Sequence, residues 1–194
     1  MVSPSNATDG SDVKRPLITA SAMMATTVVV LDINIASIAL PHMQGGLSAN
    51  QDQVSWIMTT YFMMQATTMA ATGWLAEKVG RKRLFIWSLI GFAGCSVLSG
   101  NANSIPEIMF FRGLQGMFSA PVVPISQALM LDAYPRERHG QALAIWGTGV
   151  MFAPVMGPVL GGWLTEEFSW RWVFYVSMPF AILGVLGAIF SVPE

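Results

Sequence analysis

The chain has 194 residues, of which 53% are hydrophobic and only 11% are charged, and its formal net charge is −1. A typical soluble domain carries roughly 25% charged residues, so this chain has too few charges to coat the surface of a soluble fold. The near-neutral net charge gives no bias toward nucleic acid, and the single cysteine, Cys95, excludes an intrachain disulfide framework and a multi-cysteine metal site. We therefore predict an all-α, polytopic membrane protein.

Residues 1–16 are rich in Ser, Asp, Asn and Gly and show no apolar periodicity. We predict that they form a disordered tail. The apolar stretch that follows is too long for a secretory signal peptide and lacks a small-residue cleavage pattern before a polar mature domain. Residues 17–194 are therefore predicted to form one transmembrane bundle.

A spanning helix needs about 20 apolar residues, and six segments approach or exceed that length. They are residues 17–40, which Pro41 follows, and residues 54–76, 84–100, 107–133, 141–164 and 172–191. Most are apolar on every face, so periodicity alone does not separate them from buried helices of a soluble protein. Their length, their long charge-free runs and the asymmetry of the connections together favour six transmembrane helices.

The Lys and Arg residues are unevenly distributed among the connections. Eight of the ten lie in the tail, the second connection and the fourth connection: Lys14, Arg15, Lys78, Arg81, Lys82, Arg83, Arg136 and Arg138. The first and third connections have none, and the fifth has only Arg171. The positive-inside rule places the basic side in the cytoplasm. Because six spans return the chain to its starting side, we expect both termini to be cytoplasmic.

Two ionisable residues lie deep within the predicted spans. Asp32 precedes Pro41 by nine residues, and Arg112 lies about two turns into the fourth span, so both should lie at similar depth in the outer half. Gln115 is one turn further along the same helix face. A carboxylate at bilayer depth costs about 2.5–3.5 kcal/mol on insertion scales, so Asp32 should face a cavity or a partner. These residues favour proton or cation binding at Asp32, and a purely structural Asp32–Arg112 ion pair is the alternative.

The fifth predicted span contains Pro154, Gly157, Pro158 and Gly161. The two glycines form a small-xxx-small face that lets another helix approach closely, and each proline removes a backbone donor and bends the helix. We predict a kinked, closely packed helix. The sequence has no phosphate-binding loop, nucleophile elbow or zinc-helix motif, so we predict neither an enzyme nor a metal site.

Four motifs, in this order along the chain, resemble the major facilitator superfamily. Residues 73–83 resemble its loop between the second and third helices, residues 111–116 its fourth-helix motif, and residues 157–162 the fifth-helix motif of its drug antiporters. Residues 31–41 together with 170–174 resemble the fourteen-span EmrB/QacA drug:proton antiporter branch. The resemblance extends over most of the chain, from about residue 17 to residue 179.

The resemblance implies functions for the residues that match. Asp32 would be the first-helix acid linked to substrate or proton, and Arg112 the proton-relay arginine. Pro154, Gly157, Pro158 and Gly161 would form the bend that limits proton leak. The cytoplasmic gating loop would comprise Gly73, Glu77, Gly80 and Arg81, with Asp132 placed to pair with Arg81. Glu77 stands where the family usually has Asp, which puts the capping geometry of this acid in doubt.

The resemblance also implies an activity: export of drug-like amphipathic or cationic compounds across the cell (inner) membrane in exchange for protons. The proton gradient would supply the energy, with no cofactor. The family folds as two six-helix bundles, so we expect this chain to be the N-terminal half, with the missing C-terminal half or a second copy as its partner. In a Gram-negative source, a periplasmic adaptor and an outer-membrane channel are implied. Two alternatives stay open: a half-size transporter that works as a dimer, and a non-transporting truncated remnant or membrane scaffold.

Overall fold

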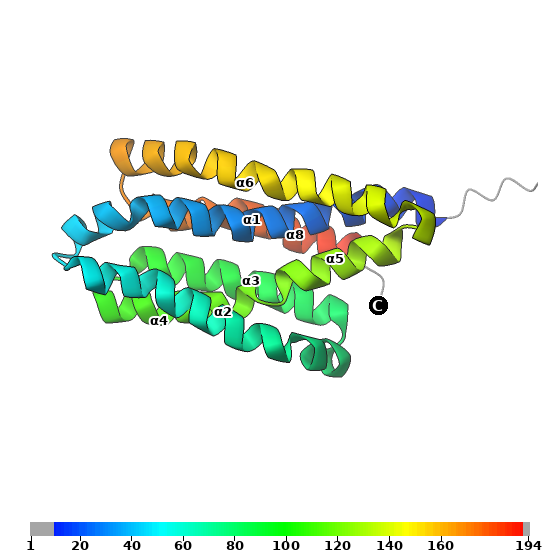
Figure 1. The fold of residues 1–194 in the computed structure, drawn as a ribbon, viewed down its shortest axis with the longest axis horizontal. Helices are drawn as coiled ribbons and strands as arrows, with labels where there is room; N and C mark the ends of the chain where they lie inside the picture. Colours follow the sequence, from blue (N-terminus) through cyan, green and yellow to red (C-terminus); the bar gives the residue numbers. More distant parts are fainter. Residues whose placement is uncertain (1–9, 192–194) are drawn as a thin grey trace, which may run out of the picture.

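The computed structural model describes residues 10–191, and no strand occurs among them. The helices, in chain order, are α1 (Gly10–Gly46), α2 (Gln51–Val79), α3 (Arg81–Asn101), α4 (Ile105–Ser119), α5 (Val122–Ala133), α6 (His139–Glu167), α7 (Trp172–Tyr175) and α8 (Ser177–Ser191), with a 3-10 turn η1 (Arg136–Arg138) before α6. The long helices lie along a common axis (Figure 1). The predicted all-α class is confirmed.

Local sequence signals account for the boundaries of α2. The side chain of Asn50 accepts a hydrogen bond from the Gln53 amide at 2.8 Å, and the Gln53 side chain accepts one from the Asn50 amide at 3.0 Å. This reciprocal capping box satisfies two backbone donors at the start of α2. At the other end, Gly80 adopts φ +90°, a conformation that glycine adopts without steric cost. A single residue therefore suffices to connect α2 to α3.

Two of the predicted spans contain a break. The fourth is divided into α4 and α5 around Pro121, and the sixth into α7 and α8 around Val176. Prolines explain both positions, because Pro121 and Pro179 have no N–H to donate to the carbonyls of Met117 and Tyr175, four residues earlier. Each broken pair still forms one continuous apolar segment, residues Ile105–Ala133 and Trp172–Phe190.

The first helix is longer than the apolar run predicts. It begins at Gly10, so the expectation of a disordered tail is wrong for residues 10–16, whereas residues 1–9 lie outside the described part of the chain. It also continues through Pro41 to Gly46. Hydrophobicity marks the part of a helix that lies in the membrane, and helical hydrogen bonding continues beyond it. Pro41 removes only its own N–H, and Leu47 N still donates to Met43 O.

The number of apolar spans also differs from the prediction. In the part of the chain that the structure describes, five helical segments are long and apolar enough to cross a membrane. The second predicted span, residues 54–76, is not among them. It lies within α2, which has 29 residues and is therefore long enough. Its many Thr and Gln side chains reduce its hydrophobicity, so α2 is a sixth long helix with a partly polar surface.

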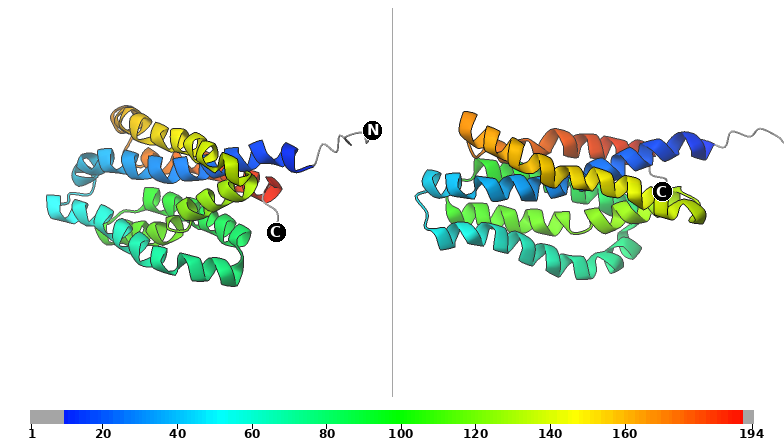
Figure 2. Two further views of the ribbon diagram at one scale, coloured as in Figure 1. Left: turned by 45° about the vertical axis from the view of Figure 1, so that its right-hand side comes forward. Right: turned by 45° about the horizontal axis from the view of Figure 1, so that its top comes forward.

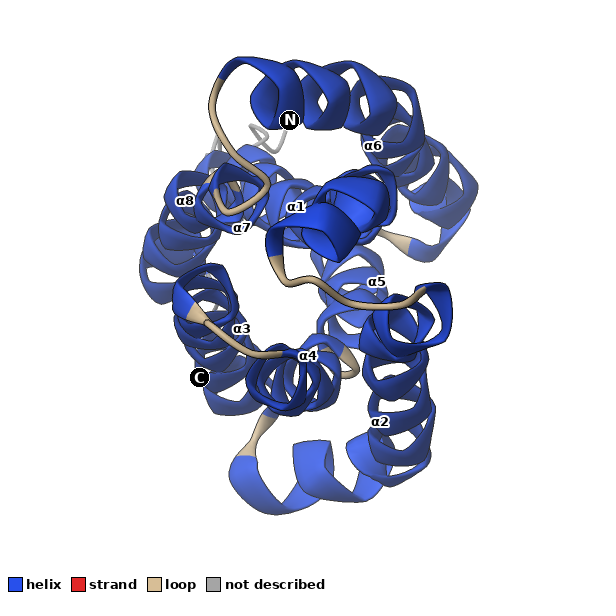
Figure 3. Ribbon diagram, turned by 90° about the vertical axis from the view of Figure 1, so that its left-hand side faces the viewer, coloured by secondary structure: helices blue, strands red, loops and turns tan. Residues whose placement is uncertain are grey.

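The connections alternate between the two ends of the bundle. The start of α1, the α2–α3 turn, the α5–α6 connection and the end of α8 share one end (Figures 1 and 2). Arg81, Lys82, Arg83, Arg136 and Arg138 belong to this basic end. The α1–α2, α3–α4 and α6–α7 connections lie at the opposite end, which faces the viewer in Figure 3. The structure thus groups the connections as predicted, and the membrane side of each end stays a prediction.

Helix α1 is the central element of one side of the bundle. It packs against α6, α8 and α5, while α2 packs mainly on α4, and α3 bridges α4 and α8 (Figure 3). Buried apolar side chains fill the space on both sides of α1, including Ile35, Ile57, Phe85 and Phe92. Among the described helices, α1 and α4 do not pack directly on each other, so long side chains must bridge the space between them.

Helices α2 and α4 approach each other most closely at Gly116. A Cβ atom added at Gly116 would overlap the backbone carbonyl of Tyr61. A backbone contact of this kind is available only to glycine, and it brings the side chains of Tyr61 and Arg112 to the same level of the bundle.

We predict that Gly116→Ala destabilises the bundle, because the added methyl group must push α2 away from α4. Overpacking of this kind typically costs about 1–3 kcal/mol. The measurement is the melting temperature of the detergent-solubilised protein. Gly94→Ala is the matched control, because a Cβ there meets nothing within 4 Å. A melting temperature for Gly116→Ala equal to that of Gly94→Ala would show that the α2–α4 contact is not tight.

Candidate functional site

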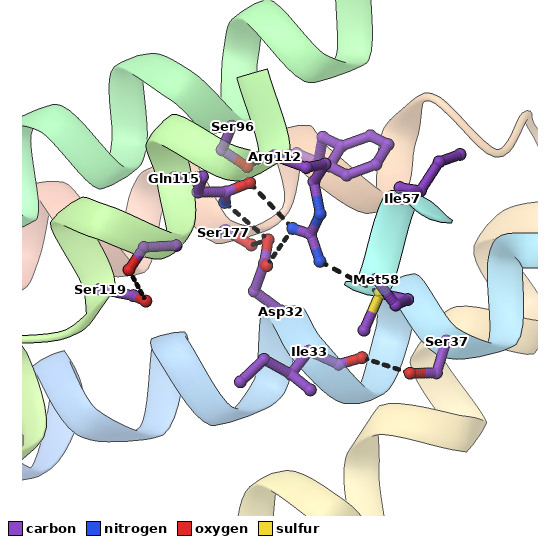
Figure 4. Close-up of polar contacts among 12 residues, drawn as sticks. Asp32, Ile33, Ser37, Ile57, Met58, Ser96, Arg112, Gln115, Ser119 and Ser177 are labelled. Atoms are coloured by element: carbon purple, nitrogen blue, oxygen red, sulfur yellow. Dashed lines mark hydrogen bonds and ion pairs between the residues drawn. The ribbon is translucent and has the colours of Figure 1, made fainter. Parts of the chain in front are cut away.

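The two ionisable residues predicted to meet are in direct contact. Arg112 Nη1 donates to Asp32 Oδ2 at 2.6 Å, and both side chains are completely buried (Figure 4). The contact joins α1 to α4, and the two residues lie at a similar depth along the bundle. The prediction that Asp32 and Arg112 lie together is therefore confirmed.

Asp32 accepts hydrogen bonds from three different side chains. Besides Arg112, Gln115 Nε2 donates to Asp32 Oδ1 at 3.2 Å, and Ser177 Oγ donates to the same oxygen at 3.1 Å. Gln115 Oε1 in turn accepts from Arg112 Nη1 at 2.8 Å. The carboxylate thus acts only as an acceptor, which is the hydrogen-bonding pattern of an ionised acid.

Aromatic and sulfur-containing side chains surround the guanidinium group of Arg112. Its Cζ lies 4.6 Å from the ring centroid of Tyr61 and 5.5 Å from that of Phe174. Its Nη2 donates to Met58 Sδ at 3.5 Å. Ring faces attract a cation most strongly when water is excluded. The arginine is therefore held by three helices, although Asp32 is its only charged partner among the residues that the structure describes.

The break between α7 and α8 places Ser177 in the site. Ser96 Oγ of α3 donates to the carbonyl of Phe174 at 2.8 Å, which anchors α7 in the interior. At the end of the bundle, Arg171 Nη1 donates to the carbonyls of Gly100 and Ala102, both at 2.8 Å, and so ties the start of α7 to the end of α3. Because a new helix, α8, begins at Ser177, the Ser177 hydroxyl can point toward Asp32.

Sequence reasoning found Asp32, Arg112 and Gln115 but missed Met58, Tyr61, Phe174 and Ser177. Ser177 carried a usable signal, since it is a polar residue within an apolar span. Nothing in the local sequence separates Met58, Tyr61 or Phe174 from ordinary apolar core residues. Their contribution depends on how α2 and α7 pack against Arg112.

Helix α6 packs tightly on α1 close to Asp32. A Cβ added at Gly157 would lie 2.6 Å from the Cβ of Asn34, and one added at Gly161 would lie 3.4 Å from the Cα of Ile35. The small-residue face predicted for this helix is therefore confirmed. Pro154 and Pro158 lie on the exposed side of α6, which runs unbroken through both. The bend that they were expected to cause stays a prediction.

The residues of the predicted gating loop lie at the basic end of the bundle. Arg81 Nη1 donates to Asp132 Oδ2 at 2.7 Å, as expected, and the two side chains are 57% and 62% exposed. Lys78 Nζ lies 4.3 Å from the centroid of the Trp74 ring. Gly73 and Glu77 are exposed, and Glu77 has no hydrogen-bond or ion-pair partner within the described chain. The structure thus forms one of the expected loop contacts and leaves Glu77 free for others.

Adding a proton to Asp32 would change the contacts of the site. Ionised Asp32 satisfies Arg112, Gln115 and Ser177 at once. Protonated Asp32 has a hydroxyl group that donates, so it loses acceptor capacity and leaves Arg112 as a buried, uncompensated cation. Arginine does not release its proton in proteins. Protonation of Asp32 therefore requires the surroundings of Arg112 to rearrange or to admit water.

Comparison with known proteins identifies relatives of this chain. A family model described as Major Facilitator Superfamily matches residues 22–194. The multidrug export protein EmrB of Escherichia coli K12 is 38% identical over 170 residues, which is 88% of this chain and 33% of that protein. The probable multidrug resistance protein EmrY of the same strain is 36% identical over 166 residues, 86% of this chain and 32% of that protein. The chain thus spans about a third of the length of the curated relatives it matches.

A solved structure shares the fold. The crystal structure of a bacterial homologue of the human lysosomal transporter Spinster, in an inward-facing and occupied conformation, superposes with a TM-score of 0.81 at 19% identity. The match covers 93% of this chain and 44% of that one. At this identity the likeness establishes the fold of the bundle and nothing finer.

We predict that Arg112→Met strongly destabilises the bundle, because it leaves Asp32 buried without its cation. Breaking a buried ion pair on one side typically costs about 3–5 kcal/mol. Adding Asp32→Asn to Arg112→Met should restore part of the lost stability, since it removes the uncompensated charge. Thermal unfolding of the single and double variants measures this coupling. A double variant less stable than Arg112→Met alone would contradict it.

We predict the opposite for the exposed pair at the basic end. Asp132→Asn should change the free energy of unfolding by less than about 1 kcal/mol, because exposed ion pairs are screened by water and salt. Thermal unfolding at low and high salt is the measurement. A large loss of stability would mean that Arg81 and Asp132 brace this bundle by themselves.

Proposed function

The chain belongs to the major facilitator superfamily, and from this premise we propose that it forms the N-terminal six-helix bundle of a proton-coupled exporter of drug-like amphipathic or cationic compounds. The family match, the export proteins among its relatives and the apolar helices support a multi-pass protein of the cell membrane. The basic end of the bundle would face the cytoplasm, by the positive-inside rule, with both termini on that side.

The observation that carries the proposal is the buried Asp32 carboxylate with its three donors. An ionisable group at this depth is costly, and its presence favours a function over packing. A proton on Asp32 and a cationic substrate near it would neutralise the same charge. Binding of one would therefore favour release of the other, which is the requirement for exchange.

An apolar pocket on the α1, α6 and α8 side of the bundle supports an amphipathic substrate; Leu31 lines it, whereas Asp32 itself does not. The pocket has a volume of about 310 Å³ and is lined by side chains of α1, α6 and α8, among them Met23, Met24, Leu31, Phe152 and Met156. Pockets that bind small molecules begin at about this size. Methionine side chains are flexible and polarisable, so they adapt to apolar ligands of different shape.

The partly polar surface of α2 supports a second bundle as partner. Ser55, Thr59 and Thr67 are exposed on this helix, and each hydroxyl donates to the backbone carbonyl four residues earlier, so the surface supports a partner through its low hydrophobicity and not through unsatisfied groups. A C-terminal bundle or a second copy of the chain would cover this surface or enclose water against it. The periplasmic adaptor and outer-membrane channel expected in a Gram-negative source stay predictions.

The other motifs would control access to Asp32. Close packing of Gly157 and Gly161 on α1 would exclude water beside Asp32 and so limit uncoupled proton leak. The exposed Arg81–Asp132 pair would hold the cytoplasmic end of α2 and α3 against α5 in one conformation and release it in another. Its low intrinsic stability suits a contact that forms and breaks during transport.

Asp32→Asn tests the proposal in proteoliposomes. We predict that this variant loses dye movement driven by an imposed pH gradient and still folds, with a lower melting temperature, because asparagine resembles the protonated acid in shape, cannot titrate and leaves Arg112 without its counterion. Asp52→Asn is the matched control, since Asp52 is exposed at the start of α2, and it should transport normally.

Three results would count against parts of the proposal. Normal transport by Asp32→Asn would exclude Asp32 as the proton-binding group. Loss of folding in parallel with loss of transport would favour a structural Asp32–Arg112 pair. A folded wild-type chain that moves no dye would exclude transport by this bundle alone, and restoration by a second bundle would then be required.

A further inference from the structure

Two buried polar atoms beside the Asp32 site lack well-formed hydrogen bonds. Within the described residues, four buried side-chain atoms have no partner, and the Tyr61 hydroxyl and Arg112 Nε are two of them. Leaving such a group unsatisfied costs about 1–3 kcal/mol. Buried polar atoms of this kind are usually satisfied by internal water molecules. Both atoms belong to the α2–α4 side of the site.

Two further polar side chains, Ser119 and Gln65, extend the cluster of Tyr61 and Arg112 away from Asp32. The Tyr61 hydroxyl is directed toward Ser119 without a well-aligned hydrogen bond to it. Ser119 Oγ accepts from Gln65 Nε2 at 3.0 Å and donates to the Gly116 carbonyl at 2.8 Å. Tyr61 and Ser119 are completely buried, whereas Gln65 is only half-buried. The cluster therefore leads from the buried ion pair toward an accessible surface.

Helical spacing aligns these side chains in a row. Arg112, Gln115 and Ser119 lie at i, i+3 and i+7 on one face of α4 (Figure 4), and Tyr61 and Gln65 lie at i and i+4 on α2. Ser119 is about 10 Å beyond Arg112 toward the basic end, at the helical rise of ~1.5 Å per residue. One helical turn separates Gln115 from Ser119, which is further than a direct hydrogen bond spans.

We propose that Tyr61, Ser119 and Gln65 hold a short chain of buried water molecules, which connects the Asp32–Arg112 pair to the surface at Gln65. The Tyr61 hydroxyl and Arg112 Nε would donate to these waters. The water site stands on the geometry alone. Its use as the proton route to Asp32 rests on the proposed function.

The proton step balances without any other reactant. Solvent at Gln65 gives a proton to the outer water, each water passes one proton inward, and the innermost water protonates the Asp32 carboxylate. Release is the reverse. Among the groups that face Asp32, Arg112 from α4 and Tyr61 from α2 are titratable or charged, and neither needs to change its charge. Gln115 and Ser177 contribute neutral hydrogen bonds only.

Radiolytic footprinting of the intact chain in lipid nanodiscs tests the water site directly. Hydroxyl radicals formed from bound water oxidise neighbouring side chains even when bulk solvent is excluded. We expect Tyr61 to be oxidised several-fold faster than Phe92, an aromatic residue of α3 that is equally buried. Labelling of Tyr61 no faster than that of Phe92 would show that the cluster is dry and would overturn the proposal.

Two variants separate the water chain from ordinary solvent leakage. Gln65→Leu removes the polar group at similar volume, and Ser119→Val removes it at the volume of its control Ser119→Thr, so each should lower Tyr61 oxidation to the level of Phe92. Ser119→Thr keeps the hydroxyl group and should leave the oxidation high. Undiminished oxidation in folded Ser119→Val and Gln65→Leu proteins would contradict the assignment of these residues. If neither variant folds, the comparison of Tyr61 and Phe92 oxidation rates in wild-type protein tests the proposal by itself.

Infrared spectroscopy separates this proposal from the proposed function. After a pH jump, the carboxylic-acid band assigned with Asp32→Asn should appear several-fold more slowly in Ser119→Val than in wild type, and reach the same final intensity. Equal rates would exclude this route for the proton. Absence of any Asp32 band in wild type would instead contradict proton binding at Asp32, whatever the footprinting shows about water.

Discussion

The rest of the bundle depends on burying one ion pair in an apolar interior. Removing an aspartate and an arginine from water costs more than their attraction returns unless other hydrogen bonds complete both groups. Here Gln115 and Ser177 donate further hydrogen bonds to the Asp32 carboxylate. Met58, Tyr61 and Phe174 surround the Arg112 guanidinium. Four of the six helical spans therefore supply part of one site: α1, α2, α4 and the α7–α8 pair.

Helix approach at glycine is what makes this site possible. Gly116 lets α2 come close enough to place Tyr61 over Arg112, and Gly157 brings α6 onto α1 beside Asp32. The Asp32–Arg112 and Arg81–Asp132 ion pairs differ accordingly. The buried pair is bound to a particular packing, so its breakage must move helices. The exposed Arg81–Asp132 pair is screened by solvent and can open at little cost.

The sequence was informative wherever a residue was unusual for its surroundings. Charges within apolar spans predicted the Asp32–Arg112 contact, basic connections predicted which ends of helices lie together, and glycines predicted that another helix packs closely on α6. Prediction failed where hydrophobicity and helix length diverge: α1 extends past its apolar run at both ends, and α2 is as long as a span but more polar. It also missed Tyr61, Met58 and Phe174, because ordinary apolar residues acquire their function here only through packing against Arg112.

The central claim is that Asp32 exchanges a proton for a cationic ligand. Proton release on ligand binding tests it most directly, measured with a pH indicator in weakly buffered detergent solution as a lipophilic cation is added to the protein. In a sample acidified until Asp32 is protonated, wild-type protein should release protons in proportion to the cation bound, and Asp32→Asn should release none. Binding of the cation to wild-type protein with no proton release would contradict the account.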